Sequence, residues 1–170
     1  MVTAITISFA LAFEKLEPDA MSRPPRSPRT PLLSGYSLWR ILFVSVLIGG
    51  GALWISQTLL NEGISLRVVR TVTLNTIVIP QMFHLFNVRS ISGFALNRNF
   101  FSNKVAFLVC VVLMVLQVAI TYLPFMNRVF GTFPLNAEAW VVPFGLGFLV
   151  FVIIEIEKAI VRSIGRTRQP

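Results

Sequence analysis

Long uncharged runs of hydrophobic residues alternate with short charged intervals along the chain. Four runs predict full transmembrane helices, because about 20 apolar residues at 1.5 Å per residue span the roughly 30 Å hydrocarbon core of a bilayer. These runs cover residues 38–60, which contain a single charge, Arg40, near their start, and the uncharged residues 71–88, 105–123 and 139–154. A fifth run, residues 1–13, is long enough for only about 20 Å of helix. The expected fold is therefore all-α: an integral membrane bundle of four full transmembrane helices with an N-terminal half helix.

Small residues follow one another along one face of the first full span. Ser45, Gly49, Ala52 and Ser56 are spaced by four, three and four positions, which places them on the same side of a helix. Small side chains allow two helices to approach closely inside a membrane. The pattern predicts a helix-packing face, although the Gly49-Gly50-Gly51 run is also consistent with simple helix flexibility.

The second full span is unusually polar for a segment in lipid. At 100° per residue, one stripe contains Thr73, Thr76, Pro80, His84 and Asn87. Polar groups in hydrocarbon need partners, so this stripe must face protein or water. Two interpretations stay open: the stripe borders an ion path, or it forms hydrogen bonds with neighbouring helices. His84 has no second ligand nearby in the sequence, and we interpret it as structural.

Charge supports a membrane topology. The chain has 170 residues, 55% of them hydrophobic, with 15 Lys and Arg against 7 Asp and Glu. The basic residues lie between apolar runs instead of covering one polar face, so we expect no nucleic-acid partner. Twelve of the 15 fall in or beside intervals 14–37, 89–104 and 155–170. By the positive-inside rule, these intervals and the C-terminus are expected in the cytoplasm. A single cysteine, Cys110, excludes an intrachain disulfide.

The first cytoplasmic interval carries a specific motif. It contains Glu14, Glu17-Pro18-Asp19, Met21 and Arg23-Pro24-Pro25-Arg26, and its prolines disfavour helix. Together with residues 1–13, this segment resembles the end of the sixth transmembrane helix and the following loop of P-type cation-transporting ATPases. A second segment, "RTVTLNTIVIPQMFHLFNVRS", resembles the eighth helix of bacterial members. The resemblance covers essentially the whole chain and implies the last four spans of such a pump.

The resemblance implies roles and partners that the residues alone do not. In the family, the first loop lies beneath the membrane near the stalk that transmits movement. Carried to this chain, Glu17, Asp19, Arg23 and Arg26 would form a coupling loop. The implied partners are the lipid bilayer and the remaining helices and cytoplasmic domains of a P-type ATPase. The implied location is a bacterial plasma membrane, and ATP and magnesium would belong to the full-length pump.

The chain departs from the family at the positions that bind cations. Of the sixth-helix "D..TD" pattern only Thr3 remains, since the second aspartate falls at Ala4, and the eighth-helix acid position falls at Val78. Hard cations prefer oxygen ligands. The weak candidates for lining an ion path are therefore neutral oxygen donors: Thr3, Thr6, Thr73 and Thr76. These departures disfavour a two-site calcium pump and leave the transported cation unassigned.

Catalytic motifs of the family are missing from this sequence. Nothing resembles the phosphorylated "DKTGT" segment, the "TGE" loop or the "GDG.ND" magnesium segment, so no catalytic, cofactor-binding or confident metal-binding residue is expected. The leading interpretation is a C-terminal membrane-domain fragment that supports the transport helices without hydrolysing ATP. The alternative is a stand-alone four-span protein that assembles with or regulates a cation pump. An independent four-helix channel is a third interpretation, disfavoured because the polar stripe has no charged ring.

Overall fold

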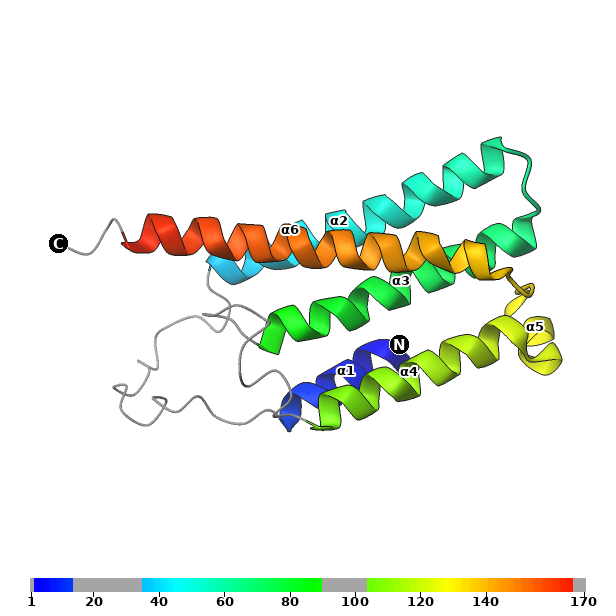
Figure 1. The fold of residues 1–170 in the computed structure, drawn as a ribbon, viewed down its shortest axis with the longest axis horizontal. Helices are drawn as coiled ribbons and strands as arrows, with labels where there is room; N and C mark the ends of the chain where they lie inside the picture. The colour runs from blue at the N-terminus through cyan, green and yellow to red at the C-terminus, as the bar shows by residue number, and fades with distance from the viewer. Residues whose placement is uncertain (1, 14–34, 90–103, 167–170) are drawn as a thin grey trace.

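Helices account for the regular structure of the described residues, with no strand among them (Figure 1). The computed structural model describes residues 2–13, 35–89 and 104–166. Its elements are α1 (Val2–Ala12), α2 (Gly35–Asn61), α3 (Leu66–Arg89), α4 (Lys104–Tyr122), α5 (Pro124–Phe130), η2 (Ala137–Trp140) and α6 (Val141–Arg166). This confirms the expected all-α fold. The coupling-loop residues Glu17, Asp19, Arg23 and Arg26 lie outside the described residues.

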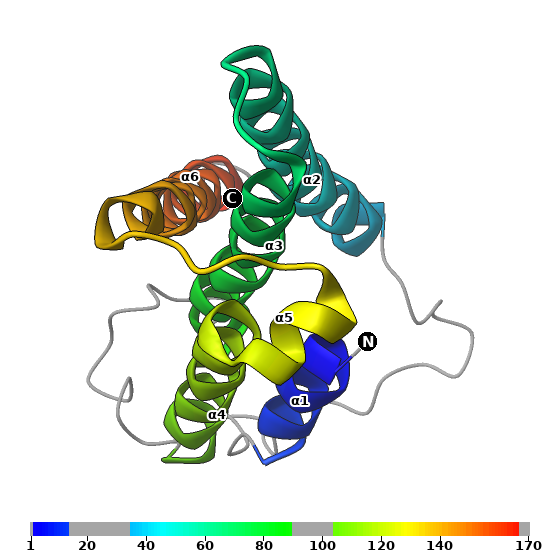
Figure 2. The same cartoon turned by 90° about the vertical axis from the view of Figure 1, so that its right-hand side faces the viewer.

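The central element is α3, which packs against α2, α6, α4 and α1 (Figure 2). Its most extensive interface is with α6, while α1 pairs mainly with α4. One buried apolar cluster joins α1, α3 and α4 through Ala10, Leu85, Ala106, Val109 and Leu113. A second joins α2 to α6 through Val44, Ile48, Val150 and Ile154. The other three long helices and α1 therefore form one packed bundle around α3.

The outer faces of the bundle are apolar. Three helical segments are long and hydrophobic enough to cross a membrane by length and composition: Ser37–Asn61, Lys104–Tyr122 and Ala137–Val161. Large side chains such as Val46 (72% exposed) and Trp54 (73% exposed) point away from the bundle on α2. In water such surfaces would be costly, whereas in lipid they need no cover. The chain is an integral membrane protein.

Two helices differ from this pattern. The 11-residue α1 is apolar but shorter than a span, in agreement with the expected half helix. The 24-residue α3 is long enough, yet its polar residues keep it outside the group of apolar spans. The role of α3 as a fourth span stays a prediction. The position of α3 among the apolar helices supports this prediction.

A compact corner joins α4 to α6 at one end of the bundle. Gly131 ends α5 with a left-handed backbone, φ 63°, a conformation that glycine adopts without steric cost. The Thr132 hydroxyl donates to the Ile120 carbonyl at 2.7 Å. The Tyr122 hydroxyl donates to the Leu135 carbonyl at 2.8 Å and accepts from Trp140 Nε1 at 2.9 Å. These bonds fix the point at which α6 enters the bundle.

Candidate functional site

Buried polar side chains gather on α3. Thr71, Asn75, Thr76 and Asn87 are each no more than 1% exposed, because neighbouring helices cover α3 on several sides. A buried polar group without a partner is costly, so the partners of these groups indicate what the helix does.

The contact between α2 and α3 is polar at Ser56 and Thr73. Their hydroxyl oxygens lie 2.6 Å apart, so one hydroxyl donates to the other. Each hydroxyl oxygen also lies within hydrogen-bonding distance of a carbonyl in its own helix. Ala52, one turn earlier on α2, is only 3% exposed. Two members of the predicted packing face, Ala52 and Ser56, are thus in contact with the rest of the bundle.

The other two members of that face lie on an open part of α2. Ser45 is exposed, and a Cβ added to Gly49 would meet no atom within 4 Å. The closest glycine approach on α2 is made instead by Gly51, whose added Cβ would lie 3.0 Å from the Leu146 methyl groups of α6. The packing role of Ser45 and Gly49 accordingly stays a prediction about helices beyond those described.

At the corner end of the bundle, α3 is bonded to α4 and to the segment after α5. Thr71 Oγ1 accepts a hydrogen bond from the Phe133 backbone N–H at 2.8 Å. Asn75 Nδ2 donates to Thr121 Oγ1 at 3.5 Å. Thr71 and Asn75 lie off the predicted stripe, so helical periodicity did not predict their role. Only the folded arrangement shows that Thr121, 46 positions later, faces Asn75.

At the other end, α3 is bonded to α6. Asn87 Nδ2 donates to the Phe151 carbonyl at 3.5 Å, and Lys158 Nζ donates to the Asn87 carbonyl at 3.4 Å. Lys158 also forms an ion pair with Glu155 and is only 3% exposed. The sequence placed Lys158 in a tail beyond the membrane. In the structure α6 continues to Arg166 and buries this lysine against α3.

The four threonines proposed to line an ion path belong to different parts of the bundle. Thr3 and Thr6 are half-buried on α1, and the Thr6 hydroxyl donates to the Val2 carbonyl at 2.7 Å. Thr73 contacts α2, and Figure 2 shows α1 and α2 on opposite sides of α3. Thr76 is fully buried, and its hydroxyl has no hydrogen-bond partner. Their shared role stays a prediction.

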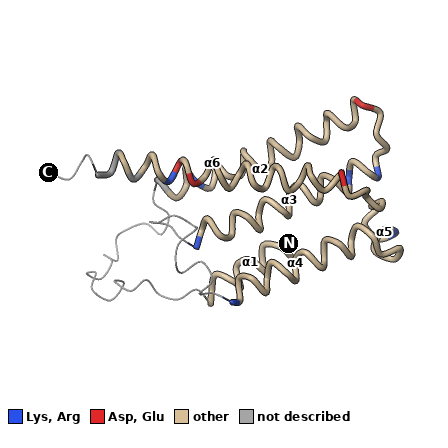
Figure 3. Tube along the Cα trace, in the orientation of Figure 1, with Lys and Arg blue, Asp and Glu red and all other residues tan. Residues whose placement is uncertain are grey.

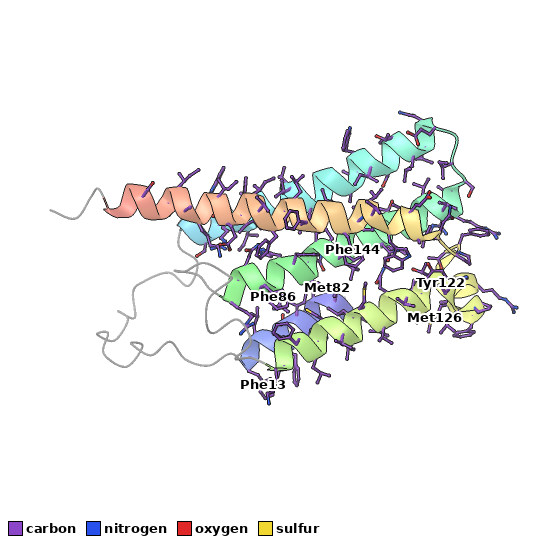
Figure 4. The ribbon with its side chains drawn as sticks, in the orientation of Figure 1. Phe13, Met82, Phe86, Tyr122, Met126 and Phe144 are labelled. Atoms are coloured by element: carbon purple, nitrogen blue, oxygen red, sulfur yellow. The ribbon has the colours of Figure 1, made fainter. Side chains whose placement is uncertain are left out.

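A hollow of about 360 Å³ between α3, α4 and α6 is apolar. Five phenylalanines line it together with Met82 and Cys110, and Figure 4 labels Met82, Phe86 and Phe144. Such a surface offers no oxygen ligand to a hard cation. Across the described residues, no group of three or more His, Cys, Asp or Glu side chains is placed to hold a metal ion. The polar chemistry of the bundle is therefore concentrated in contacts between helices.

These observations first define a class of protein: a multi-pass helical membrane protein whose central helix is bonded to its neighbours through polar side chains. The family follows from comparison with known sequences. The family described as "Cation transporting ATPase, C-terminus" matches residues 1–160. The chain belongs to this family, which confirms the resemblance inferred from its motifs.

Individual relatives agree with this assignment. The chain is 37% identical over 162 residues to "Probable cation-transporting ATPase F" of Mycobacterium tuberculosis, covering 95% of this chain and 18% of the relative. It is 31% identical over 152 residues to "Cation-transporting ATPase pma1" of Synechocystis, covering 84% and 16%. It is 30% identical over 161 residues to "Calcium-transporting ATPase type 2C member 2" of Mus musculus, covering 94% and 17%. The chain thus spans less than a fifth of the length of these relatives.

The bond between Ser56 and Thr73 leads to a test with a matched control. We expect Thr73→Val to lower the stability of the protein by about 1 kcal/mol, because hydrogen bonds between membrane helices contribute on this scale. Thr76→Val removes a buried hydroxyl that has no partner, and we expect a change near zero or slightly stabilising. Thermal unfolding in detergent, followed by tryptophan fluorescence, measures both. Equal losses in the two variants would contradict the assigned hydrogen bond.

Proposed function

We propose that this chain forms the C-terminal membrane domain of an ATP-driven cation pump and supports the transport helices without hydrolysing ATP itself. The observation that carries the proposal is that polar side chains on α3 form hydrogen bonds to neighbouring parts of the bundle. Thr71, Thr73 and Asn75 bond to other parts of the bundle, as does Asn87. Side chains engaged in this way hold helices in register through their amide N–H and hydroxyl groups, while the side-chain oxygens of Asn75 and Asn87 are buried without a hydrogen-bond partner.

The distribution of acids supports the same role. The sequence has no Asp or Glu between Glu62 and Glu138, so α3 and α4 contain no carboxylate. Carboxylates are the strongest oxygen ligands that a protein offers to a hard cation. A pump built with this domain would therefore take its charged cation ligands from other helices. The threonines Thr73 and Thr76 would contribute neutral oxygens at most.

The proposal includes a membrane topology, a coupling loop and a surface for the transport helices. The C-terminus and residues 14–37 would lie in the cytoplasm, by the positive-inside rule. Glu17, Asp19, Arg23 and Arg26 would couple this domain to the cytoplasmic domains, where ATP and magnesium bind. The transport helices would pack against this bundle, and the open stretch of α2 at Ser45 and Gly49 offers them a surface of small residues.

A glycine series on α2 tests the proposal. We expect Gly49→Leu to leave this bundle folded but to weaken its association with the rest of the pump, because the added side chain would occupy an open packing face. Gly50→Leu is the matched control: its added Cβ also meets nothing within 4 Å, and it points about 100° away around the helix. The measurement is the amount of assembled pump and its cation-dependent ATP hydrolysis in membranes.

The outcomes separate packing within the bundle from packing with the pump. Gly51→Leu would press on Leu146 of α6 and should lower the stability of the bundle itself. If Gly49→Leu had normal assembly and activity, the small-residue face of α2 would not be the docking surface. If it lowered both while Gly50→Leu did not, the supporting role would gain direct experimental support.

A further inference from the structure

Three arginines from two distant parts of the chain meet at the corner end of the bundle. Arg67 and Arg70 lie in the first turns of α3, and Arg128 lies on α5. All three line one hollow of about 570 Å³, together with residues of the segment after α5 that include Thr132 and Phe133. Figure 3 shows basic positions gathered where α3 begins and α5 lies. Arg70 and Arg128 are 58 positions apart in the sequence, so only the fold brings them together.

The corner that holds these arginines is built from specific contacts. Gly131 has no side chain, and a Cβ there would collide with the Arg70 guanidinium. The guanidinium consequently lies against the C-terminal end of α5. The hydrogen bond from Phe133 N–H to Thr71 Oγ1 holds the same segment against α3. The walls of the hollow are thus fixed by backbone and side-chain bonds on both sides.

The lining of this hollow carries positive charge and no acidic residue, and the acidic residue of η2, Glu138, lies outside the lining. None of the three arginines forms an ion pair with a described carboxylate, and no acidic residue lines the hollow. Like charges brought together repel one another, and an anion placed between them relieves that repulsion. Guanidinium groups bind phosphate oxygens in a bidentate manner, which makes a phosphate group the best match.

Exposed apolar side chains lie on α5 and on the segment after it, both of which contribute residues to the charged hollow. Phe125 is 70% exposed and Val129 is 61% exposed on α5, and Phe133 on the rim is also exposed. Tyr122 and Trp140 stack at the same corner, as is common where helices leave the hydrocarbon. A soluble anion would gain nothing from these side chains, whereas the acyl chains of a lipid would cover them.

We propose that this hollow binds the headgroup phosphate of an anionic phospholipid, with Arg67, Arg70 and Arg128 as its ligands and the apolar rim against the acyl chains. The inference depends on the chain being in a membrane and is independent of its proposed role in a pump. It assigns the three basic residues outside the cytoplasmic intervals to a lipid site. The bound lipid would join α3 to α5 and stabilise the corner from which α6 begins.

This site can be tested by native mass spectrometry of the purified 170-residue chain. The protein is titrated with phosphatidylglycerol or with phosphatidylcholine. Each arginine near an anionic lipid contributes about 1 kcal/mol, roughly a fivefold effect on binding. We therefore expect Arg128→Gln to weaken phosphatidylglycerol binding about fivefold. The double variant that carries both Arg67→Gln and Arg128→Gln should weaken it about 30-fold. Lys104→Gln, an exposed charge at the other end of α4, is the matched control and should bind as the parent does.

A second measurement distinguishes the source of the phosphate and guards against misfolding. Phosphatidylglycerol should raise the unfolding temperature of the parent protein, while inorganic phosphate at millimolar concentration should not. Both arginine variants keep Arg70 against Gly131, and Arg128→Gln changes only an exposed side chain. Equal phosphatidylglycerol binding by parent and folded arginine variants would overturn the proposal. So would equal stabilisation by phosphate alone, since the ligand would then be a free anion.

Discussion

Replacing Gly147 with leucine is expected to force α3 and α6 apart and to lower the free energy of unfolding by about 3 kcal/mol, the upper part of the range for overpacking a core. A Cβ at position 147 would lie 2.7 Å from Phe83 Cδ2 and 3.4 Å from Ile79 Cγ2. The Phe83 ring packs edge-on to Phe144 and Phe151 with centroids 6.5 and 6.4 Å away, so moving it into the adjoining apolar hollow would break both ring contacts. The α3–α6 interface is the most extensive in the bundle, so the effect should reach the whole domain.

Gly145, two residues earlier on the same helix, offers the control for this variant. A Cβ there meets nothing within 4 Å, so Gly145→Leu adds the same side chain on an open surface. We expect it to change stability little. Chemical unfolding in mixed micelles, monitored by tryptophan fluorescence, gives the two free energies. If both variants lost the same amount, the cause would be helix propensity or insertion, and the close α3–α6 contact would not be responsible.

Removing the Lys158 charge is expected to have a similarly large effect. Lys158 is 3% exposed, pairs with Glu155 and donates to the Asn87 carbonyl. Breaking a buried ion pair from one side typically costs about 3 to 5 kcal/mol, because the remaining charge loses its partner. We expect Lys158→Met to lower the free energy of unfolding by about 3 kcal/mol.

A double variant separates the ion pair from the volume of the side chain. Adding Glu155→Gln to Lys158→Met removes the charge of the carboxylate that has lost its contact with Lys158, and we expect it to restore a substantial part of the lost stability. Lys104→Met removes a charge from an exposed position at the start of α4 and should have little effect. The same unfolding assay applies to all three proteins. A double variant less stable than Lys158→Met would show that Lys158 acts through its packing and its bond to Asn87.

Together these contacts connect the central helix α3 to its neighbours along its whole length. Polar bonds join α3 to α2, to α4 and to α6, and glycines allow the closest approaches. A bundle connected at both ends resists relative sliding of its helices. In the proposed pump, such a domain would provide a fixed surface against which the transport helices move.

The sequence alone determined the class of fold and the family. Uncharged runs of about 20 residues specify membrane helices, because the thickness of the hydrocarbon core sets a length that few other structures require. The motifs around Glu17 to Arg26 indicated the family, and the match over residues 1–160 confirms it. Hydrophobic periodicity also indicated that the polar stripe of α3 must face protein or water. Helix length and polarity depend on residues that are close in sequence, so the spacing of polar and apolar residues is enough to predict them.

Only the tertiary structure decided which residues meet. The predicted stripe contained Thr73 and Asn87 but omitted Thr71 and Asn75, which are also buried and bonded. Their partners lie tens of residues away, and the choice of partner depends on how each helix is rotated and tilted against the next. The arginine hollow has the same origin, since Arg70 and Arg128 share a site through the path of α4 and α5. Helical periodicity defines the faces of each helix, but helix packing determines which faces come into contact.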